Sequence, residues 1–280
     1  ETRAADGGPV DIHEVELVNV NFAYNATVPV LRDINLTARK GETIAIVGPT
    51  GSGKSTLVNL VCRFYQPTSG QVRIDGIDYR NRSLRWLQSN LGVVLQNAHV
   101  FRGTVLENIR YGRLTASDSD VIEAAETVGA HEFINALENG YRTDVGEDGD
   151  MLSAGQKQLV SFARAILADP QILVMDEATS SVDTVTEAKI QRSLGQVLSG
   201  RISFVIAHRL STIRNADRIV VLIDGQISEI GDHAELIARG GHYANLYYQQ
   251  SLQEATRDWP SNRANDQTED GEDLVEPSPA

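Results

Sequence analysis

Three things are scarce in this sequence: cysteine, positive charge and long hydrophobic runs. Cys62 is the only cysteine, so no disulfide can form within the chain, which fits a reducing compartment. No apolar run approaches the roughly eighteen residues of a membrane-spanning helix, and no signal-peptide pattern opens the chain. A chain of 280 residues is nevertheless long enough for one or two domains whose core needs no disulfide.

Acidic residues outnumber lysine and arginine, 38 against 25, which gives a net charge of −13. A general nucleic-acid binder needs a basic surface to displace counterions, so we expect no nucleic-acid partner. Part of the negative charge lies at the end of the chain, where six acidic residues occur without lysine or arginine: Asp266, Glu269, Asp270, Glu272, Asp273 and Glu276. We expect residues 251–280 to form an acidic disordered tail that acts by solvation rather than as a protein-binding segment.

The other end of the chain also has the composition of a connecting segment. Gly7, Gly8 and Pro9 lie within residues 1–12, which we interpret as a linker. The first residue is Glu1 rather than methionine, so we expect the sequence to be a piece of a longer protein.

One stretch combines glycine, lysine and hydroxyl residues in a spacing with chemical meaning. Gly48-Pro49-Thr50-Gly51-Ser52-Gly53-Lys54-Ser55-Thr56 follows an apolar run at 43–47 and opens a helical pattern at 57–62. The glycines allow a tight turn, so that backbone N–H groups and the positive end of the helix can surround an anion. In such a loop Lys54 reaches the β and γ phosphates and the Ser55 hydroxyl holds magnesium. The sequence therefore predicts a site for a nucleoside triphosphate.

The remaining pattern alternates strands with helices, which predicts an α/β core with a mostly parallel sheet. Short strands at 14–22, 30–38 and 71–76 predict an antiparallel β-subdomain. Helical periodicity at 104–111, 117–137 and 153–168 predicts a mainly helical insert, and Ser83 is placed to cap a helix at 83–91. Later elements are expected as a buried strand at 172–175, a helix at 184–198, strands at 202–207 and 218–223, and a last helix at 232–248.

Two carboxylates close the apolar strand at 172–175. Asp176 can hold a magnesium ion already fixed by Ser55 and the phosphates, because this ion keeps waters and needs few protein ligands. Glu177 beside it can accept a proton from the attacking water. The alternative is that both residues only cap a strand-to-helix turn.

Together with Leu152-Ser153-Ala154-Gly155-Gln156, these stretches resemble the nucleotide-binding domain of an ATP-binding cassette (ABC) transporter over residues 13–250. The resemblance implies a RecA-like P-loop NTPase core with a mostly parallel sheet, an antiparallel β-subdomain and an ABC-specific helical insert at about 97–170. It also implies the cofactors ATP and Mg²⁺. The matching positions are, in order, Tyr24, the Walker A loop from Gly48 to Thr56, the Q-loop residue Gln96, the signature from Leu152 to Gln156, the Walker B pair Asp176 and Glu177, the D-loop Ser180-Ser181-Val182-Asp183, and the H-loop residue His208.

The resemblance assigns a role to each of these residues. Tyr24 stacks on the adenine, although a lone tyrosine at a strand end more often packs on its sheet. Gln96 is a magnesium ligand through its carbonyl, together with Ser55 and Asp176. His208 donates to a γ-phosphate oxygen or orients Glu177, so that Glu177, His208, Lys54 and Gln96 are the candidate catalytic residues.

The signature implies a second domain as partner. It opens a helix, so Ser153, Gly155 and Gln156 form a second anion site at a helix N-terminus. In the family two domains pack head to tail, and each ATP lies between the Walker A loop of one domain and the signature and D-loop, here Asp183, of the other. ATP binding then holds the domains together and hydrolysis releases them.

Further stretches resemble the exporter branch, in which the domain lies at the cytoplasmic face of the cell membrane. Residues 101–109 are similar to the segment that receives the coupling helices of the transmembrane domain. Residues 143–149 are similar to the exporter X-loop, and residues 208–212 to the exporter H-loop.

Ala154 departs from the family pattern, where glycine is usual. Its methyl group is expected to crowd a backbone that approaches phosphate, and it excludes conformations with positive φ. Because Glu177 is intact while the signature is altered, we favour a heterodimer, with this chain as its catalytically competent half, over a homodimer.

The function that this pattern predicts is the ATP-hydrolysing motor of an ABC-type membrane exporter. The alternative is a soluble ABC-type ATPase that acts on nucleic acid or chromatin, but such proteins need long coiled coils or tandem cassettes. A third possibility is an isolated domain that binds ATP with little turnover because its partner is missing. The transported substrate cannot be read from this sequence.

Overall fold

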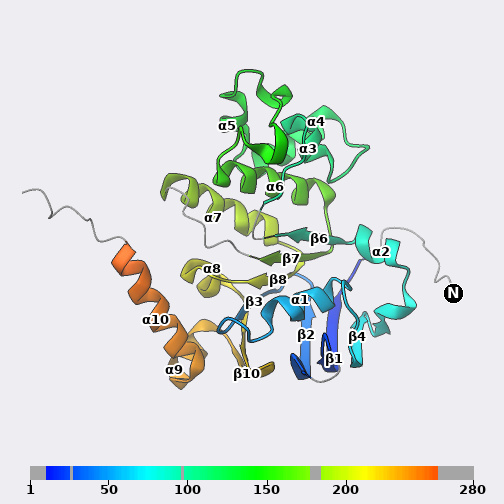
Figure 1. Cartoon of the computed structure of the whole chain (residues 1–280), viewed down its shortest axis with the longest axis vertical. Coiled ribbons are helices and arrows are strands. Elements are labelled where there is room, and N and C mark those ends of the chain that lie inside the picture. Colours follow the sequence, from blue (N-terminus) through cyan, green and yellow to red (C-terminus); the bar gives the residue numbers. More distant parts are fainter. Residues whose placement is uncertain (1–10, 26–27, 96–97, 177–183, 258–280) are drawn as a thin grey trace, which may run out of the picture.

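In the computed structural model, which describes residues 11–25, 28–95, 98–176 and 184–257, the apolar runs of the sequence form a central six-stranded sheet (Figure 1). Its strands lie in the order β10 (Gln226–Gly231), β9 (Arg218–Ile223), β3 (Thr43–Val47), β8 (Ile202–Ile206), β7 (Ile172–Asp176) and β6 (Leu91–Val94). The pairs from β9 to β6 are parallel, and β10 alone runs antiparallel to its neighbour. The predicted α/β core with a mostly parallel sheet is confirmed.

A second, antiparallel sheet forms the predicted β-subdomain. It has the order β2 (Leu31–Arg39), β1 (Glu14–Phe22), β4 (Ser69–Ile74) and β5 (Ile77–Asp78). After β5 come a 3₁₀ turn, Tyr79–Asn81, and α2 (Leu84–Ser89). The backbone N–H of Trp86 donates to the Ser83 hydroxyl at 3.1 Å, so Ser83 caps α2 as predicted.

The central sheet is buried on both faces, because successive side chains of a strand point to opposite sides. In β3, Ile44 and Ile46 face a core shared with the β-subdomain and with α1 (Lys54–Val61). Ala45 and Val47 face a second core, which is shared with the helical insert. The phosphate loop therefore begins from a strand held by its neighbours and by a core on each side.

The insert contains four α-helices: α3 (Val105–Arg110), α4 (Asp118–Thr127), α5 (His131–Asn135) and α6 (Ala154–Ala168). Two 3₁₀ turns, Gly140–Arg142 and Glu147–Gly149, lie between α5 and α6. The single helix predicted at 117–137 is wrong, because Gly129 has φ +66° and separates α4 from α5. Ser117 caps α4 through a capping box with Asp120.

The end of the chain differs from the prediction in three ways. The helix expected at 232–248 is two helices, α9 (His233–Arg239) and α10 (His242–Arg257), because Gly240 ends α9 in the left-handed conformation. The predicted disordered tail does not begin at residue 251, because α10 continues to Arg257. The residues there include leucine, glutamine and glutamate, which have good helix propensity. Two short elements were missed, α8 (Leu210–Asn215) and β10.

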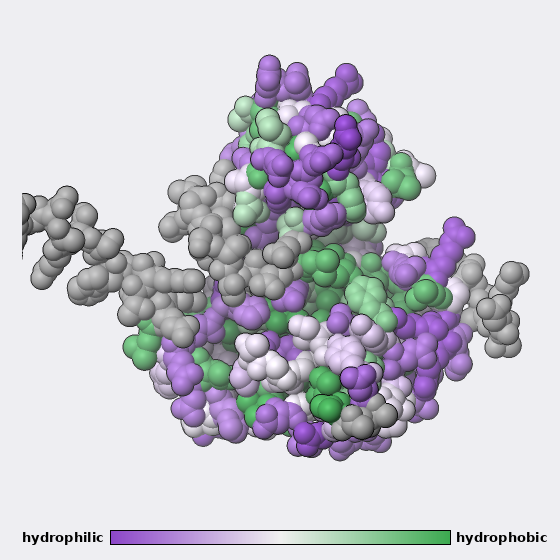
Figure 2. All heavy atoms as spheres, in the orientation of Figure 1, coloured by the Kyte–Doolittle hydropathy of each residue, from purple (hydrophilic) through white to green (hydrophobic). Residues whose placement is uncertain are grey.

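The helix predicted at 184–198 is confirmed as α7 (Thr184–Leu198). Across the described ranges, no helix combines the length and the hydropathy that crossing a bilayer requires. Figure 2 shows hydrophobic side chains gathered on the visible face where the helical insert meets the body of the molecule.

Candidate active site

The phosphate loop joins the interior strand β3 to α1, and its glycines are required by its geometry. Gly48 has φ +151°, and a Cβ placed there would lie 2.2 Å from the carbonyl oxygen of Leu222 in β9. Gly51 has φ +83° with open space around it. Gly53 is the N-cap of α1 at φ +102°, and no side chain caps this helix. The first N–H groups of α1 are therefore available to an anion.

Lys54, the first residue of α1, lies along this loop. Its Nζ donates to the carbonyl oxygens of Gly48 at 2.9 Å and Pro49 at 3.0 Å. Burial lowers the pKa of the ammonium group, and the negative charge of Asp176 opposes that shift. A half-buried cation that donates to two neutral carbonyls is well placed to bind a phosphate oxygen.

Asp176 and His208 follow the carboxyl ends of two neighbouring parallel strands, β7 and β8. Burial raises the pKa of the Asp176 carboxyl, while the charges of His208 and Lys54 lower it. Burial lowers the pKa of the His208 imidazole, Asp176 raises it, and Lys54 lowers it. These three side chains therefore act on one another electrostatically at the edge of a parallel sheet where ligands commonly bind.

The residues present fit a magnesium ion held mainly by phosphate and water. Ser55 is the second residue of α1 and its side chain is exposed, and Asp176 supplies a carboxylate near Lys54. The described ranges contain no cluster of three or more His, Cys, Asp or Glu side chains that could hold a metal. A hydroxyl and one carboxylate are a donor set that suits Mg²⁺ when a nucleotide supplies the other oxygens.

One buried polar atom in the loop has no protein partner. Ser52 is buried, and its Oγ makes no hydrogen bond to any part of the chain that the structure describes. The carbonyl oxygen of Ser52 accepts from the N–H of Gly225 at 3.2 Å, which ties the loop to the turn between β9 and β10. This hydroxyl lies against Gly48, where an added Cβ would be 2.9 Å from Ser52 Oγ.

Tyr24 lies beside the end of the loop, with its hydroxyl 3.1 Å from Oγ1 of Thr56. Its ring packs edge to face on Phe22, with the ring centroids 4.9 Å apart, and on Tyr65 at 5.1 Å. About half of Tyr24 is nevertheless exposed, at 49%. The contact with Phe22 agrees with packing of Tyr24 on the sheet, and the exposed part of the ring leaves room for a base. Tyr65, which packs on Tyr24, was not predicted from the sequence.

The signature residues begin α6 in a self-contained capping box. The N–H of Gln156 donates to Ser153 Oγ at 3.3 Å, and the N–H of Ser153 donates to Gln156 Oε1 at 2.9 Å. Gly155 is buried, and Ala154 is exposed and helical. Alanine is compatible with the backbone at position 154, because this helical position needs no positive φ. Crowding of a phosphate by the methyl group stays a prediction.

The two predicted anion sites lie on different sides of the sheet. The core under α6 contains Leu159 and Phe162, and the core around α1 contains Leu57 and Leu60. Figure 1 shows α6 and α1 on opposite sides of the strands β6, β7 and β8. Within one chain, the structure groups Lys54 with Asp176 and His208, and it places Ser153 in the other half of the fold.

The segments at 101–109 and 143–149 are joined to each other by backbone hydrogen bonds. The N–H of Val145 donates to the Gly103 carbonyl at 2.9 Å, and the N–H of Val105 donates to the Thr143 carbonyl at 3.1 Å. Thr104 and Asp144 form an isolated bridge in the same place. The stretch predicted to receive the coupling helices and the X-loop-like stretch therefore form one structural unit.

Arg164 joins this unit to the signature helix, and sequence reasoning missed it. From the second half of α6 its guanidinium donates to the carbonyl oxygens of Asn108 at 2.9 Å and His99 at 3.0 Å, and to Asn108 Oδ1 at 3.1 Å. It also lies over the rings of Phe101 at 5.1 Å and Tyr111 at 5.9 Å. The signal in the sequence that could have identified Arg164 is that it is the only charged residue in the mostly apolar run at 159–167.

Three predicted site residues, Gln96, Glu177 and Asp183, lie outside the described residues, as does the whole D-loop at 180–183. Their roles stay predictions.

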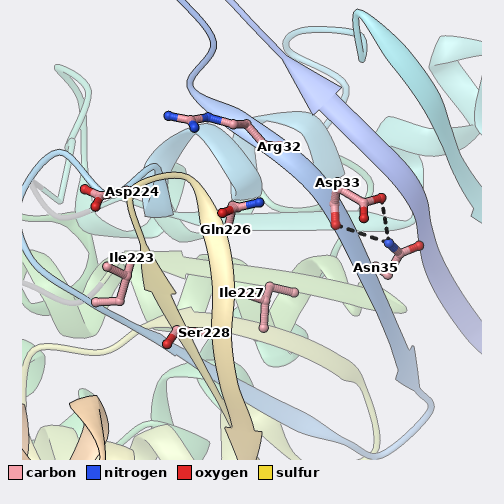
Figure 3. A pocket seen from close by; sticks show the side chains of 8 residues that line it. All are labelled: Arg32, Asp33, Asn35, Ile223, Asp224, Gln226, Ile227 and Ser228. Atoms are coloured by element: carbon pink, nitrogen blue, oxygen red, sulfur yellow. Dashed lines mark hydrogen bonds between the residues drawn. The ribbon is translucent and has the colours of Figure 1, made fainter.

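An open groove of about 560 Å³ lies where the β-subdomain meets the β9–β10 hairpin (Figure 3). It is lined by Arg32, Asp33, Asn35, Ile223, Asp224, Gln226, Ile227 and Ser228, none of which was predicted to bind nucleotide. Asn35 donates to the backbone and side-chain oxygens of Asp33. Gly225, between the lining residues Asp224 and Gln226, donates its N–H to the Ser52 carbonyl oxygen of the phosphate loop.

Comparison with known proteins is consistent with this geometry. The family model described as "ABC transporter" matches residues 31–180. A fatty acid ABC transporter ATP-binding/permease protein of Mycobacterium tuberculosis is 53% identical over 235 residues, which are 84% of this chain and 37% of that protein. An ATP-dependent lipid A-core flippase of Syntrophus aciditrophicus is 52% identical over 234 residues, covering 84% of this chain and 39% of that protein.

A solved structure of a bacterial Atm1-family ABC exporter with ATP bound is similar to this chain with a TM-score of 0.80 and 39% sequence identity. The match covers 91% of this chain and 44% of that one. The chain spans 37% to 40% of the length of the first curated relatives that it matches.

Proposed function

The chain belongs to the ABC transporter family as an ATP-binding domain of the exporter type, and we propose that it is the ATP-hydrolysing motor of a membrane exporter. The observation that carries this proposal is the grouping of Lys54, Asp176 and His208 around a phosphate loop that has no side-chain cap. Those are the groups that phosphoryl transfer to water requires: a cation, a magnesium ligand and a donor to the γ-phosphate.

The residues have separate roles in hydrolysis. Lys54 and the loop amides bind the phosphates and stabilise the charge that develops on them. Ser55, Asp176 and Gln96 would hold Mg²⁺, which when bound would offset the negative charge of the phosphates. Glu177 takes a proton from the attacking water. His208, whose pKa is lowered by burial, donates one N–H to a γ-phosphate oxygen.

The signature acts on the nucleotide of a second domain. Ser153 Oγ accepts a hydrogen bond from the Gln156 N–H, so its own O–H is still available to donate to a phosphate oxygen. The position of α6 on the opposite side of the sheet from α1 supports a head-to-tail pair of domains, in which Asp183 also meets the partner. Ala154 beside an intact Glu177 favours a heterodimer over a homodimer.

The stretch at 101–109, joined to the X-loop-like stretch at 143–149, is the surface that receives the coupling helices of the transmembrane domain. With this surface toward the membrane, the domain, from residue 13 to about residue 250, lies at the cytoplasmic face, with residues 1–12 as linker and an acidic tail after α10. The alternative, a soluble ATPase that acts on nucleic acid or chromatin, is less well supported, because the two relatives described above are named as a transporter and a flippase.

The test is Glu177→Gln in the complete transporter, because the amide cannot accept the proton from water. We expect nucleotide affinity to stay unchanged, ATP turnover to be lost, and a closed dimer to accumulate with ATP. Glu138→Gln, at an exposed position of the insert, is the matched control and should behave as wild type. Rapid turnover in Glu177→Gln would remove Glu177 from the role of base.

A further inference from the structure

The last helix of the described chain contacts the loop that carries His208. The side-chain Nε2 of Gln250 in α10 donates a hydrogen bond to the backbone carbonyl oxygen of His208, although the two residues are 42 positions apart. Helix α10 also packs against α8, which begins at Leu210 directly after this loop. No residue of α10 was among those predicted to take part in nucleotide chemistry.

Helix α10 is anchored firmly enough to hold this contact. The Glu229 carboxylate on β10 accepts from the backbone N–H groups of His242 at 2.6 Å and Tyr243 at 3.2 Å, which fixes the start of α10. Tyr243 is buried, and its hydroxyl lies 2.7 Å from Nδ1 of His233. Gln250 follows Tyr243 by seven positions, about two helical turns, so both lie on the same face of α10.

Small displacements of the loop that carries His208 are expected to affect the rate of hydrolysis. His208 lies two residues after the end of β8, and the N–H of Ala207 between them still donates to the carbonyl oxygen of Ile46 in β3 at 3.3 Å. Beyond Ala207 the chain leaves the sheet to enter α8, so the position of the His208 backbone depends on contacts from outside the sheet. A displacement of about 1 Å at a catalytic group can lower a rate by up to a hundredfold.

We propose that Gln250 is a positioning residue for ATP hydrolysis, which holds the His208 backbone so that the imidazole faces the γ-phosphate of bound ATP. The inference rests on the proposed function. It adds that the C-terminal helix is part of the hydrolytic machinery, acting through His208 and without touching nucleotide. Gln250 should therefore affect the rate of hydrolysis more than the affinity for ATP.

The experiment compares two neighbouring glutamines in the complete transporter. Gln250→Met keeps the length of the side chain and removes the donor, and Gln249→Met makes the same change at an exposed position of the same helix. We expect Gln250→Met to lower kcat by about threefold to tenfold, as for one lost hydrogen bond, with KM for ATP changed by less than about twofold. Gln249→Met should match wild type in both.

A double-mutant cycle with His208→Ala then tests whether Gln250 acts through His208. In single-turnover assays, Gln250→Met should cause no further loss of rate when His208 is already alanine. Equal behaviour of Gln250→Met and Gln249→Met, a rise in KM alone, or a loss that adds fully to that of His208→Ala would each overturn the proposal. If Gln250→Met does not fold, Gln250→Glu, of the same length and also without a donor, takes its place under the same criteria.

The two proposals fail differently in these assays. If the proposed function is wrong, the wild-type transporter itself shows no ATP turnover, and both proposals fall. If only the role of Gln250 is wrong, wild-type turnover is intact and one of the three outcomes above is observed.

Discussion

Two helices of this chain, α1 and α6, are predicted to meet phosphate at their N-termini, and they are built in opposite ways. Helix α1 begins after Gly53 in the left-handed conformation, with no side-chain cap, and Lys54 follows at once. Helix α6 begins after Ser153, whose hydroxyl and backbone form a reciprocal box with Gln156. The first arrangement leaves backbone donors free, while the second satisfies two of them within the protein.

The difference indicates which of the two helix N-termini depends on a ligand. At α1 the half-buried ammonium group donates to neutral carbonyls and lies near the Asp176 charge, so it can bind a phosphate oxygen supplied by a ligand. At α6 the helix start is capped within the protein, and Ser153 is exposed. We therefore expect α1 to determine nucleotide affinity and α6 to affect turnover in the assembled pair.

The largest effect is expected from Lys54→Ala in the complete transporter. Loss of charged hydrogen bonds to phosphate should weaken ATP binding by about a hundredfold or more, as measured by equilibrium titration with a fluorescent nucleotide. Lys157→Ala is the matched control, because Lys157 lies in the first turn of α6 and its Nζ donates to the Asp148 carbonyl oxygen at 2.8 Å. Similar losses in both variants would remove the distinction between the two helix starts.

The next largest effect is expected from Arg164→Lys, which tests the hydrogen bonds between α6 and the segment at 99–108. A lysine cannot reach all three oxygen acceptors of the guanidinium, so we expect the free energy of unfolding to fall by about 2 kcal/mol, with ATP affinity unchanged. Thermal unfolding with and without ATP measures both quantities. Arg85→Lys, at an exposed position of α2, should change neither. A drop in ATP affinity in Arg164→Lys would show that the packing of α6 affects nucleotide binding at α1, and would contradict separate roles for the two helices.

Substitution of Ser153 separates capping from catalysis. Ser153→Asp keeps a good N-cap but places a carboxylate toward the partner's phosphate, so turnover should fall about tenfold or more while unfolding is unchanged. Ser153→Ala should lose turnover and also about 1 kcal/mol of stability. The same aspartate change at Ser83, the cap of α2, serves as control. Wild-type turnover in Ser153→Asp would contradict a role for the signature at phosphate.

The smallest effect is expected from Ala154→Gly. The position is helical and exposed, so glycine should cost less than about 1 kcal/mol of stability, the value for a helix interior. If the alanine methyl crowds the partner's nucleotide, turnover should rise by about twofold to threefold in steady-state ATPase assays, a change of under 1 kcal/mol in the barrier. A fall in turnover would instead show that alanine is suited to this signature.

The chemistry of the site could be predicted from sequence because it depends on short stretches. The glycines, Lys54 and Ser55 lie within one loop, and the apolar run before Asp176 marks the end of a parallel strand. Ser83 could be identified as a cap for the same reason, since a cap acts within three residues. Helix breaks were less predictable, because Gly129 and Gly240 interrupt patterns that look continuous in hydropathy.

By itself, the sequence determined most of the strand and helix order, the phosphate loop and the resemblance to an ABC exporter, since each depends on neighbours along the chain. The tertiary structure alone decided that α1 and α6 lie on opposite sides of the sheet, that Arg164 meets Asn108 across 56 positions, and that Gln250 reaches His208. Such contacts join side chains that packing brings together, and the local periodicity of a sequence carries no information about them.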